Sequence, residues 1–387
     1  MKKRVKILSV ILGISLLASS CGTLFSNGND SIFTSAPSTE EDIKKKLDVI
    51  KPEIYHTITG LTLEPGSYIS VIGRSSDDSY WSEVERGALQ AVKDLNEALG
   101  YSGKDKIELA FCSPKVKNDI DDQVSLFDEE LARYPAAICL AAIDETAFEV
   151  QFDLAADSKI PIVTFDSGTV FQNASAHVAT DNYGAAQEAA EQFASLTGNT
   201  GKVVIFVSDS RSMSAKQREQ GFQDWLTEHA PDIQIADTYY FDDLHTYKLD
   251  MLKTMHPDAS DEELLEKAAD FSQKDVIQTI LKTHPDLTGI YTTNLNTTRA
   301  AAAVLSELQR EDLCLVGFDG IEGQLELLES GVVDGLILQN PYGMGYAAVV
   351  AAVRSRTTAI TEPLINTGHV WVSKETYDSE AVQALLY

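Results

Sequence analysis

Carboxylates and two adjacent aromatic rings stand close together in the stretch SDDSYW at positions 76–81. The stretch follows the apolar run SYISVIG at 67–73 and precedes a helical pattern. The carboxylate of Asp78 can accept hydrogen bonds from hydroxyl groups, and a ring at Tyr80 or Trp81 can stack on the apolar face of a ring-shaped ligand. The alternative is that both rings complete the apolar stripe of the helix and pack in the core. This segment alone leaves both interpretations open.

Two further carboxylates stand where predicted strands end. Asp166 lies in TFDSG and Asp319 lies in GFDGI, so the pair Phe-Asp recurs 153 positions later. Either aspartate could simply stabilise its own turn, because Asp before Ser-Gly or Gly often does so. In open α/β sheets, ligands bind beyond the carboxyl ends of the strands, where both side chains are expected to lie. We therefore expect them to face one shared cleft.

One arginine and two amides complete the candidate set. Arg218 lies in SAKQREQGF, in the first turns of a predicted helix, where a positive charge opposes the helix dipole and requires an acidic or polar partner. Asn294 follows the run GIYTT, and Gln339 follows DGLIL. An amide can donate and accept hydrogen bonds at once, as a hydroxyl ligand requires.

These residues require an alternation of strands and helices to bring them together. Short β-branched runs alternate with amphipathic helical patterns after residue 66, which predicts a doubly wound α/β protein with mainly parallel sheets. The expected strands lie near 67–73, 106–112, 136–142, 160–165, 175–179, 202–207, 234–240, 288–293, 313–318, 334–338 and 367–372.

The length of this region predicts two Rossmann-like lobes, since about 300 residues are long for one sheet. We expect three crossovers, near 180, 339 and 367, with the ligand cleft between the lobes. The N-terminal lobe is assigned to 66–180 plus 340–367, and the C-terminal lobe to 181–339 plus 368–387. A helical insertion is expected at about 242–272, where Ser260 and Glu263 form a capping box.

The start of the chain has the pattern of an export signal. A basic start and the apolar run ILSVILGISLLA predict a signal peptide over residues 1–20. Cys21 follows LASS, which resembles the lipobox of bacterial lipoproteins, although Ala18 stands where Leu is usual. The resemblance implies that Cys21 is lipidated and anchors the protein to a membrane. The alternative is an ordinary secreted protein with an unrelated cysteine.

Residues 21–65 are expected to form a polar tether after the lipidated cysteine. The segment is rich in Ser, Thr, Asn and Gly and leads into a short helix, for which Ser38 and Glu41 are the predicted capping pair. We therefore interpret it as a spacer and not as part of a site.

The charge and the cysteine spacing exclude two classes of function. The formal charge is −28, and removal of residues 1–20 takes away four basic residues and no acid, which gives −32. Such an acidic protein disfavours nucleic acid as a partner. No Cys-x-x-Cys or Cys/His spacing indicates a metal site, and His245 and His256 have no ligand partner at a suitable spacing. No cofactor is expected.

The motifs in chain order resemble the periplasmic sugar-binding proteins of the ribose and galactose type. The resemblance covers residues 67–372 and rests on Asp78 with its two aromatic neighbours, IPIVTFDS, ATDNYGAAQEAAE, SAKQREQGF, TTN, LVGFDG and LQNPYGMGYAA. Ser167 stands where ribose binders commonly carry Arg. Asp78 stands where they carry Asn, which is more similar to galactose and glucose binders. The calcium loop of the galactose type has no counterpart.

This resemblance implies a solute-binding protein that captures a sugar between its lobes and delivers it to an ATP-driven importer. The implied ligand-binding residues are Asp78, Tyr80, Trp81, Asp166, Ser167, Arg218, Asn294, Asp319 and Gln339. The protein is expected to be anchored on the outer face of the bacterial cytoplasmic membrane or to be periplasmic. The main alternative is a ligand-sensing subunit of a membrane receptor, such as a sensor kinase.

An enzyme is a weaker alternative. A glycosidase using Asp166 and Asp319 would require one carboxyl with a raised pKa and a suitable separation of the two. A repressor is disfavoured by the signal peptide and by the lack of a DNA-binding motif before the first strand. The predicted pocket carries three aspartates and one arginine, a local charge of −2. A neutral or amino sugar is therefore expected, and not a sugar acid or phosphate.

Overall fold

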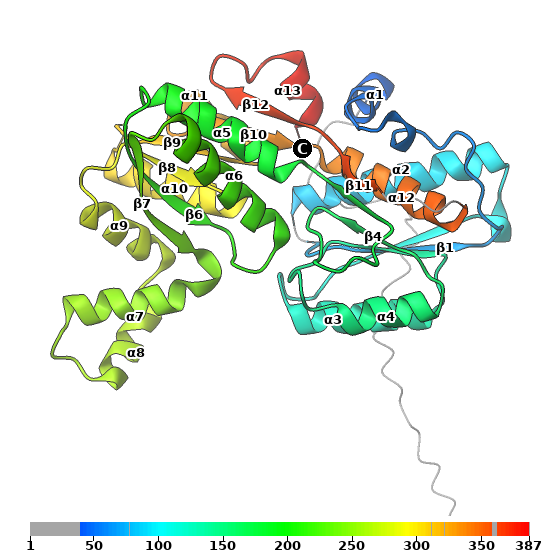
Figure 1. Ribbon diagram of the computed structural model, residues 1–387, viewed down its shortest axis with the longest axis horizontal. Helices are drawn as coiled ribbons and strands as arrows, with labels where there is room; N and C mark the ends of the chain where they lie inside the picture. The colour runs from blue at the N-terminus through cyan, green and yellow to red at the C-terminus, as the bar shows by residue number, and fades with distance from the viewer. Residues whose placement is uncertain (1–38, 77, 311, 321, 358–361, 387) are drawn as a thin grey trace, which may run out of the picture. The chain divides into compact units, whose positions relative to one another are not determined.

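The computed structural model describes residues 39–386 except 77, 311, 321 and 358–361. The predicted signal peptide at 1–20, Cys21 and the first part of the predicted tether lie outside the described residues. The described chain forms two open sheets with helices on both faces (Figure 1). This architecture confirms the predicted α/β fold with two mainly parallel sheets.

The first sheet contains six strands within the described residues, in the spatial order β11-β5-β4-β3-β1-β2, and all of its strand pairs are parallel. The strands are β1 (Tyr68–Ile72), β2 (Glu108–Cys112), β3 (Ala137–Leu140), β4 (Ile162–Phe165), β5 (Ala176–Ala179) and β11 (Glu362–Asn366). We call this sheet and the helices that cover it the first lobe.

The second sheet also has six strands in the part of the chain described, in the order β12-β10-β9-β8-β6-β7. The pair β10–β12 is antiparallel, and the other pairs are parallel. The strands are β6 (Gly201–Val207), β7 (Ile233–Tyr240), β8 (Gly289–Thr292), β9 (Cys314–Phe318), β10 (Gly335–Gln339) and β12 (His369–Ser373). This sheet and its helices form the second lobe.

Helices cover both faces of each sheet. In the first lobe they are α2 (Ser79–Leu99), α3 (Ile120–Ala132), α4 (Glu149–Asp157) and α12 (Pro341–Thr357). In the second lobe they are α5 (Asn182–Leu196), α6 (Met213–His229), α7 (Leu244–Met255), α8 (Asp261–Asp270), α9 (Gln273–Thr283), α10 (Leu295–Leu308), α11 (Glu322–Ser330) and α13 (Glu380–Leu385). The first helix is α1 (Glu40–Asp48), and short 3₁₀ turns occur at Glu53–Tyr55, Gly103–Asp105 and Phe241–Asp243.

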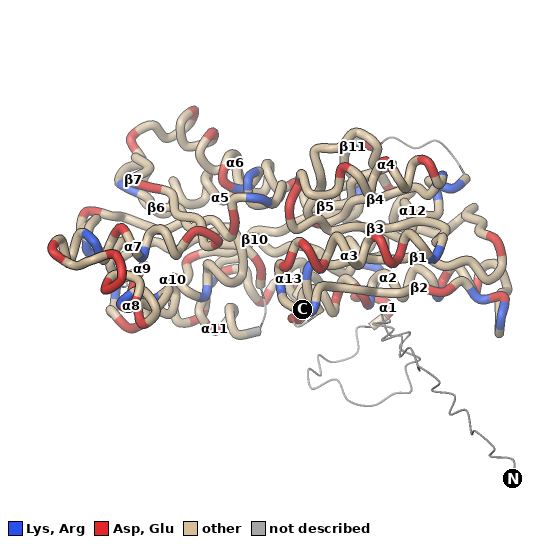
Figure 2. The backbone as a smooth tube through the Cα atoms, turned by 90° about the horizontal axis from the view of Figure 1, so that it is seen from below, with Lys and Arg blue, Asp and Glu red and all other residues tan. Residues whose placement is uncertain are grey.

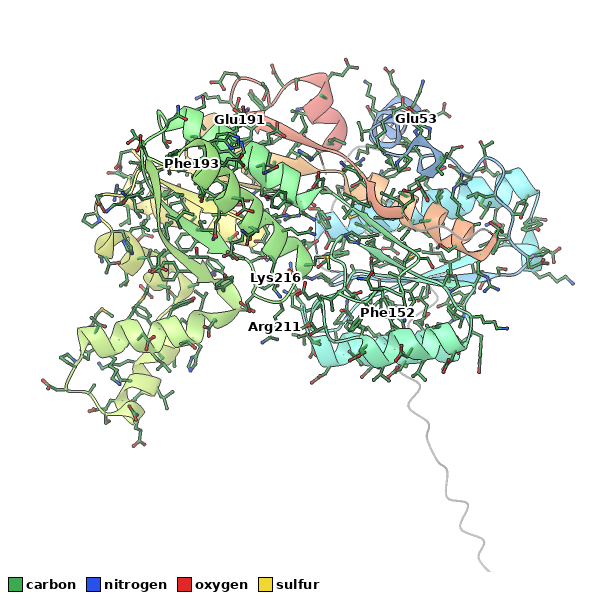
Figure 3. The ribbon with its side chains drawn as sticks, viewed as in Figure 1. Glu53, Phe152, Glu191, Phe193, Arg211 and Lys216 are labelled. Atoms are coloured by element: carbon green, nitrogen blue, oxygen red, sulfur yellow. The ribbon has the colours of Figure 1, made fainter. Side chains whose placement is uncertain are left out.

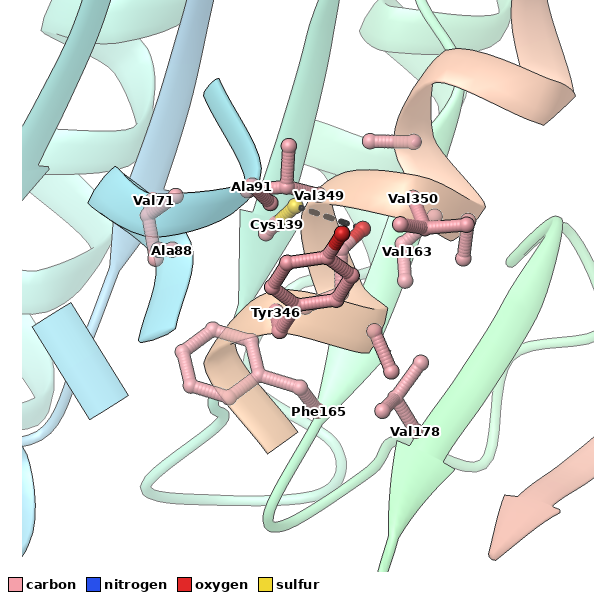
Figure 4. Packing of buried hydrophobic residues seen from close by; sticks show 14 of the residues in the cluster. Val71, Ala88, Ala91, Cys139, Val163, Phe165, Val178, Tyr346, Val349 and Val350 are labelled. Atoms are coloured by element: carbon pink, nitrogen blue, oxygen red, sulfur yellow. Dashed lines mark hydrogen bonds between the residues drawn. The ribbon is translucent and has the colours of Figure 1, made fainter. Parts of the chain in front are cut away.

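The core of the first lobe depends on close contact between α2 and α12. A Cβ atom on Gly87 would lie 1.9 Å from the carbonyl oxygen of Tyr342, and one on Gly345 would lie 1.9 Å from that of Val84. Glycine is therefore required on both helices for this approach. The side chains of α12 then pack with Phe165 and the sheet, as Figure 4 shows for Tyr346, Val349 and Val350.

The chain passes between the two sheets three times, between β5 and β6, between β10 and β11, and between β11 and β12. These passages confirm the crossovers predicted near 180, 339 and 367. The single strand predicted at 367–372 corresponds to β12, whereas β11 was not predicted. Its sequence, EPLIN, contains a proline, which strands accept mainly at sheet edges, and β11 is an edge strand.

The end of the predicted tether differs from the expectation. Helix α1 is capped by Thr39 and Asp42, which form a reciprocal capping box, and not by the predicted pair Ser38 and Glu41. The following residues are not a free spacer, because Ile50 and Tyr55 are fully buried in the core of the first lobe. Because residues 21–38 are polar, their composition did not indicate that the chain packs into the core soon afterwards.

The region 242–272 contains α7 and α8, which enclose a small apolar cluster of Leu252, Leu264 and Ala268. Ser260 and Glu263 form the predicted capping box at the start of α8. Acidic residues are spread over both lobes and gather on α8 (Figure 2). Among the described helices, none has the length and apolarity that crossing a membrane requires.

Candidate functional site

A cleft of about 630 Å³ lies at the carboxyl-terminal ends of the strands of both sheets. Eight of the nine predicted site residues line it, and the exception is Ser167. The Ser167 side chain is fully buried, and its hydroxyl has no hydrogen-bond partner among the described residues. The cleft therefore brings together all the side chains predicted from strand ends, but not the one predicted only from the family resemblance.

Asp166 reaches the cleft from the end of β4. Its backbone has a positive φ of 57°, a conformation that Asp tolerates better than most residues, and its N–H donates to the carbonyl of Val178 at 2.9 Å. The Tyr80 hydroxyl donates to Asp166 Oδ1 at 2.5 Å. Burial raises the pKa of Asp166 above its ordinary value, although Arg74, the Tyr80 hydrogen bond and Arg218 oppose this rise.

Asp319 occupies the equivalent turn after β9 in the second lobe. Its φ is 70°, and its N–H donates to the carbonyl of Ile337 at 2.8 Å. Both carboxylate oxygens have donors, because the Gln339 amide donates to Oδ1 at 2.6 Å and the Leu295 N–H to Oδ2 at 3.0 Å. Gln339 in turn accepts from the Thr180 hydroxyl at 3.0 Å, so this network reaches the crossover that follows β5.

Arg218 is a buried residue of α6, and its side chain lies against the end of β8. Its Nε donates to Asn182 Oδ1 and its Nη1 to the Thr293 carbonyl, both at 2.8 Å. The guanidinium lies 4.3 Å from the centre of the Phe318 ring. The expected polar partners are therefore an amide and a carbonyl. The flat ring beneath fixes the plane in which the guanidinium faces the cleft.

The turn before helix α2 caps this helix and also contributes side chains to the cleft. Asp78 caps helix α2, since its Oδ1 accepts from the Trp81 N–H at 3.1 Å, and its Oδ2 accepts from Lys117 Nζ at 2.9 Å. Tyr80 and Trp81 both belong to the buried core of the first lobe, and both also line the cleft. Both interpretations of the two rings therefore hold, because each ring packs in the core and also lines the cleft.

Asn294 caps helix α10 at the edge of the cleft. Its Oδ1 accepts from the Thr297 N–H at 3.0 Å, and the Thr297 hydroxyl accepts from the Asn294 N–H at 3.1 Å. The capping box fixes the side chain, and Asn294 and Thr297 both line the cleft. The sequence placed this amide at a strand end but gave no indication of its capping function.

An ion pair that sequence reasoning missed joins the lobes across the cleft. Arg74, which follows β1, lies with Nη2 3.3 Å from Oδ2 of Asp209, which follows β6, and both side chains are mostly buried. Burial would raise the pKa of Asp209, but Arg74 and the hydrogen bonds from Ser212 outweigh it and hold the pKa below its ordinary value. Both residues come two positions after an apolar strand, so the rule that indicated Asp166 could have indicated them.

The charge of the cleft differs from the predicted value of −2. Four aspartates and four basic residues line it, so their formal charges balance. The predicted count omitted Arg74, Lys117 and Arg299, and also Asp209. The other lining residues that were not predicted are Asn118, Ser208, Ser214, Ala215, Phe241, Gln273, Leu295, Asn296, Thr297 and Ala300. Most of these lie in the first turns of α6, α9 and α10, where the sequence pattern does not show which side chains face the cleft.

The chemistry of the cleft suits a ligand that carries several hydroxyl groups. Carboxylates and amides that converge from two lobes can accept and donate hydrogen bonds around a ring, and the aromatic edges can contact its C–H groups. In the described part of the chain, no cluster of three or more His, Cys, Asp and Glu side chains is arranged to hold a metal ion.

Comparison with known proteins agrees with this geometry. The family described as periplasmic binding protein domain matches residues 69–356. A ribose import binding protein of Salmonella typhimurium is 23% identical over 202 residues, which cover 51% of this chain and 58% of the relative. A D-apiose import binding protein of Paraburkholderia graminis is 24% identical over 290 residues, which cover 73% of this chain and 78% of the relative. The match thus spans little more than half the length of the ribose protein.

A solved structure shows the same fold. The carbohydrate transporter solute-binding protein from Agrobacterium radiobacter, in complex with D-arabinose, superposes with a TM-score of 0.67 at 24% identity. The superposition covers 83% of this chain and 99% of that protein. The matched family consists of binding proteins and not of enzymes. Because its model matches most of the sequence, including every residue that lines the cleft, the chain belongs to the periplasmic binding protein domain family.

Proposed function

We propose that this protein captures a sugar in the cleft between its lobes and delivers it to an ATP-driven importer. The observation that carries the proposal is the convergence of Asp166 and Asp319, from equivalent turns of two sheets, on one cleft. A ligand that contacts both would stabilise the arrangement in which the lobes enclose it. The names of the ribose and D-apiose import proteins and the bound D-arabinose of the structural relative support a sugar as the ligand.

The ligand is proposed to be a neutral sugar. The carboxylates of the cleft already have partners, with Asp78 paired to Lys117, Asp209 to Arg74 and Asp319 to Gln339. An anion that approached Lys117 or Arg74 would have to displace the carboxylate that already pairs with it. The balanced charge also removes the reason to favour an amino sugar over a neutral one. Hydroxyl groups can donate to the carboxylates without displacing their partners.

The protein is further proposed to be exported and anchored to a membrane through Cys21. The support is the signal-like start of the chain and the lipobox-like sequence before this cysteine. Anchoring would keep the binding protein near the membrane permease of the importer.

A thermal-shift screen tests the proposed ligand class. The panel should contain pentoses, hexoses, inositols, amino sugars, uronic acids and sugar phosphates. A rise in melting temperature is expected with one or more neutral sugars, because a ligand that binds only the native state stabilises it by mass action. Stabilisation by a sugar acid or phosphate, with all neutral sugars inactive, would contradict the proposed ligand class. If no sugar in the panel stabilised the protein, the proposal of sugar capture would fail.

A further inference from the structure

The segment 39–51, which we call the hinge clasp, lies against two of the three crossovers. The side chain of Asn340, at the crossover after β10, is fully buried. Its Nδ2 donates to the Lys46 carbonyl at 2.6 Å and to the Thr367 carbonyl at 2.9 Å. A single amide therefore ties the backbone of α1 to the crossovers at 340 and 367.

The end of the clasp pairs with the crossover between β11 and β12. The Lys51 N–H donates to the Asn366 carbonyl and the Asn366 N–H to the Lys51 carbonyl, both at 2.8 Å. Gly368 follows with a φ of 81°, and a Cβ atom built there would lie 3.2 Å from the Cβ of Val49. The clasp thus covers this crossover closely, and the positive φ of Gly368 favours glycine beneath Val49.

The clasp is rooted in the first lobe. Lys46 Nζ lies 3.2 Å from Oε2 of Glu83 on α2, and both side chains are buried. Ile50 is fully buried in the core of the same lobe. The ion pair and the buried Ile50 side chain together fix the clasp to this lobe. Breaking the pair would leave an unpaired buried charge, and removing Ile50 would leave a cavity in the core.

The clasp also reaches the second lobe through α13, which packs against β10 and β12. Lys45 forms an ion pair with Glu380 of α13. Lys46 Nζ lies 3.5 Å from the carbonyl of Leu386, which follows the same helix. These contacts are the links that a rotation of the second lobe relative to the first would stretch.

The contacts of the clasp occur together with contacts that join the lobes at the cleft. In addition to the pair Arg74 and Asp209, Lys216 Nζ lies 2.7 Å from Oε1 of Glu145, and the Glu145 N–H donates to the Arg211 carbonyl at 3.3 Å. Figure 3 shows Lys216 and Arg211 where the second lobe approaches the first. Two-lobed proteins of this kind open by rotation about a few hinge residues. The clasp holds the hinge in the arrangement in which the cleft contacts are made.

We propose that the hinge clasp favours the joined arrangement of the two lobes and thereby slows release of the bound sugar. This inference rests on the proposed capture of a sugar by lobe closure. It assigns to a segment outside the cleft a positioning function, since none of its residues lines the cleft. The clasp would lower the free energy of the joined state before any ligand arrives.

Charge reversal at the link between Lys45 and Glu380 tests the clasp. The variants are Lys45→Glu, Glu380→Lys and the double exchange, and the matched control is Lys44→Glu, an exposed position on the same helix. Fluorophores on unnatural amino acids at Val150 of α4 and Leu196 of α5, both exposed, report the distance between the lobes without sugar. Lys45 and Glu380 are sufficiently exposed for the variants to fold, which melting curves would verify.

Each single reversal is expected to raise the ratio of open to joined molecules about two- to fivefold, as expected for an exposed ion pair turned repulsive. The double exchange should restore most of the original ratio, because the new carboxylate at position 45 would still face Glu41, and Lys44→Glu should leave the ratio unchanged. Unchanged distances in both single variants would overturn the proposal. So would a double exchange that fails to restore the ratio, or a control that shifts equally. The measurement needs no sugar, so it remains decisive even if the ligand screen fails.

Discussion

Asp166 and Asp319 adopt the same left-handed backbone conformation, and each N–H donates to a carbonyl of the neighbouring strand. Their side chains are held differently. Asp319 accepts from an amide and from a backbone N–H, whereas the side-chain donor to Asp166 is the Tyr80 hydroxyl. Burial raises the pKa of Asp166, and additional hydrogen-bond donors would favour its ionised form. Sugar hydroxyls are suitable donors for it.

Replacing either aspartate with alanine should weaken sugar binding by about 2 kcal/mol or more, because a buried charge-assisted hydrogen bond is lost. Isothermal titration calorimetry with the sugar identified in the screen measures the change. Asp121→Ala, on the exposed start of α3, is the control and should bind normally. Full affinity in Asp166→Ala or Asp319→Ala would remove that residue from the binding site.

Several of the residues predicted from the sequence share one property, which is their position at the carboxyl end of a strand. Asp166, Asp319 and Gln339 were predicted in this way, and the structure places all three in the cleft. Lys117 and Asn118 were not predictable, because they come from the irregular connection between β2 and α3, whose path depends on packing. Ser167 was expected by analogy with an arginine of ribose binders, but its short side chain is buried instead.

At the scale of elements, β5 carries a histidine whose charge affects stability. His177 pairs in register with Thr164 of β4, and its Nδ1 lies 3.0 Å from the Thr164 hydroxyl. Burial lowers the pKa of His177 from 6.5 to about 4. The native state therefore keeps this ring neutral at pH values where the unfolded chain already binds a proton.

The free energy of unfolding should consequently fall as the pH drops from 6.5 towards 4. The contribution of His177 is roughly 2–3 kcal/mol, since one pKa unit corresponds to about 1.4 kcal/mol. His177→Gln should lose less stability than the wild type between pH 7 and pH 4.5 in urea unfolding. His245→Gln, at an exposed position on α7, should behave like the wild type. Equal acid sensitivity of His177→Gln and the wild type would show that other groups dominate.

Element prediction succeeded where the hydrophobic pattern was regular and failed at short or irregular segments. The strands near 67–73 and 202–207 appeared as expected, because each is a continuous apolar run between turn signals. Strand β11 was missed because it contains a proline and lacks a continuous apolar run. The packing of Tyr55 was missed because one buried ring in a polar segment has no periodicity to indicate it.

At the scale of the whole molecule, the proposed lipid anchor at Cys21 can be tested by one substitution. Cys21→Ser should release the protein from the membrane fraction into the soluble fraction, because the acyl chains would have no attachment site. Its affinity for sugar should be unchanged, since none of the cleft residues lies near the start of the chain. Fractionation and immunoblotting measure this, and a variant that still sediments with membranes would place the anchor elsewhere.

The fluorescence of Trp81 should report whether the cleft is occupied. The sequence holds three tryptophans, and the other two lie away from the cleft, with Trp225 stacked 4.8 Å from the His229 ring and Trp371 in β12. Trp81 lines the cleft, and its ring centre is 5.4 Å from that of Tyr80. A bound sugar should therefore change the intrinsic emission spectrum through this indole, and Trp81→Phe should abolish the change. Binding kinetics would then be measurable by stopped flow on the unlabelled protein.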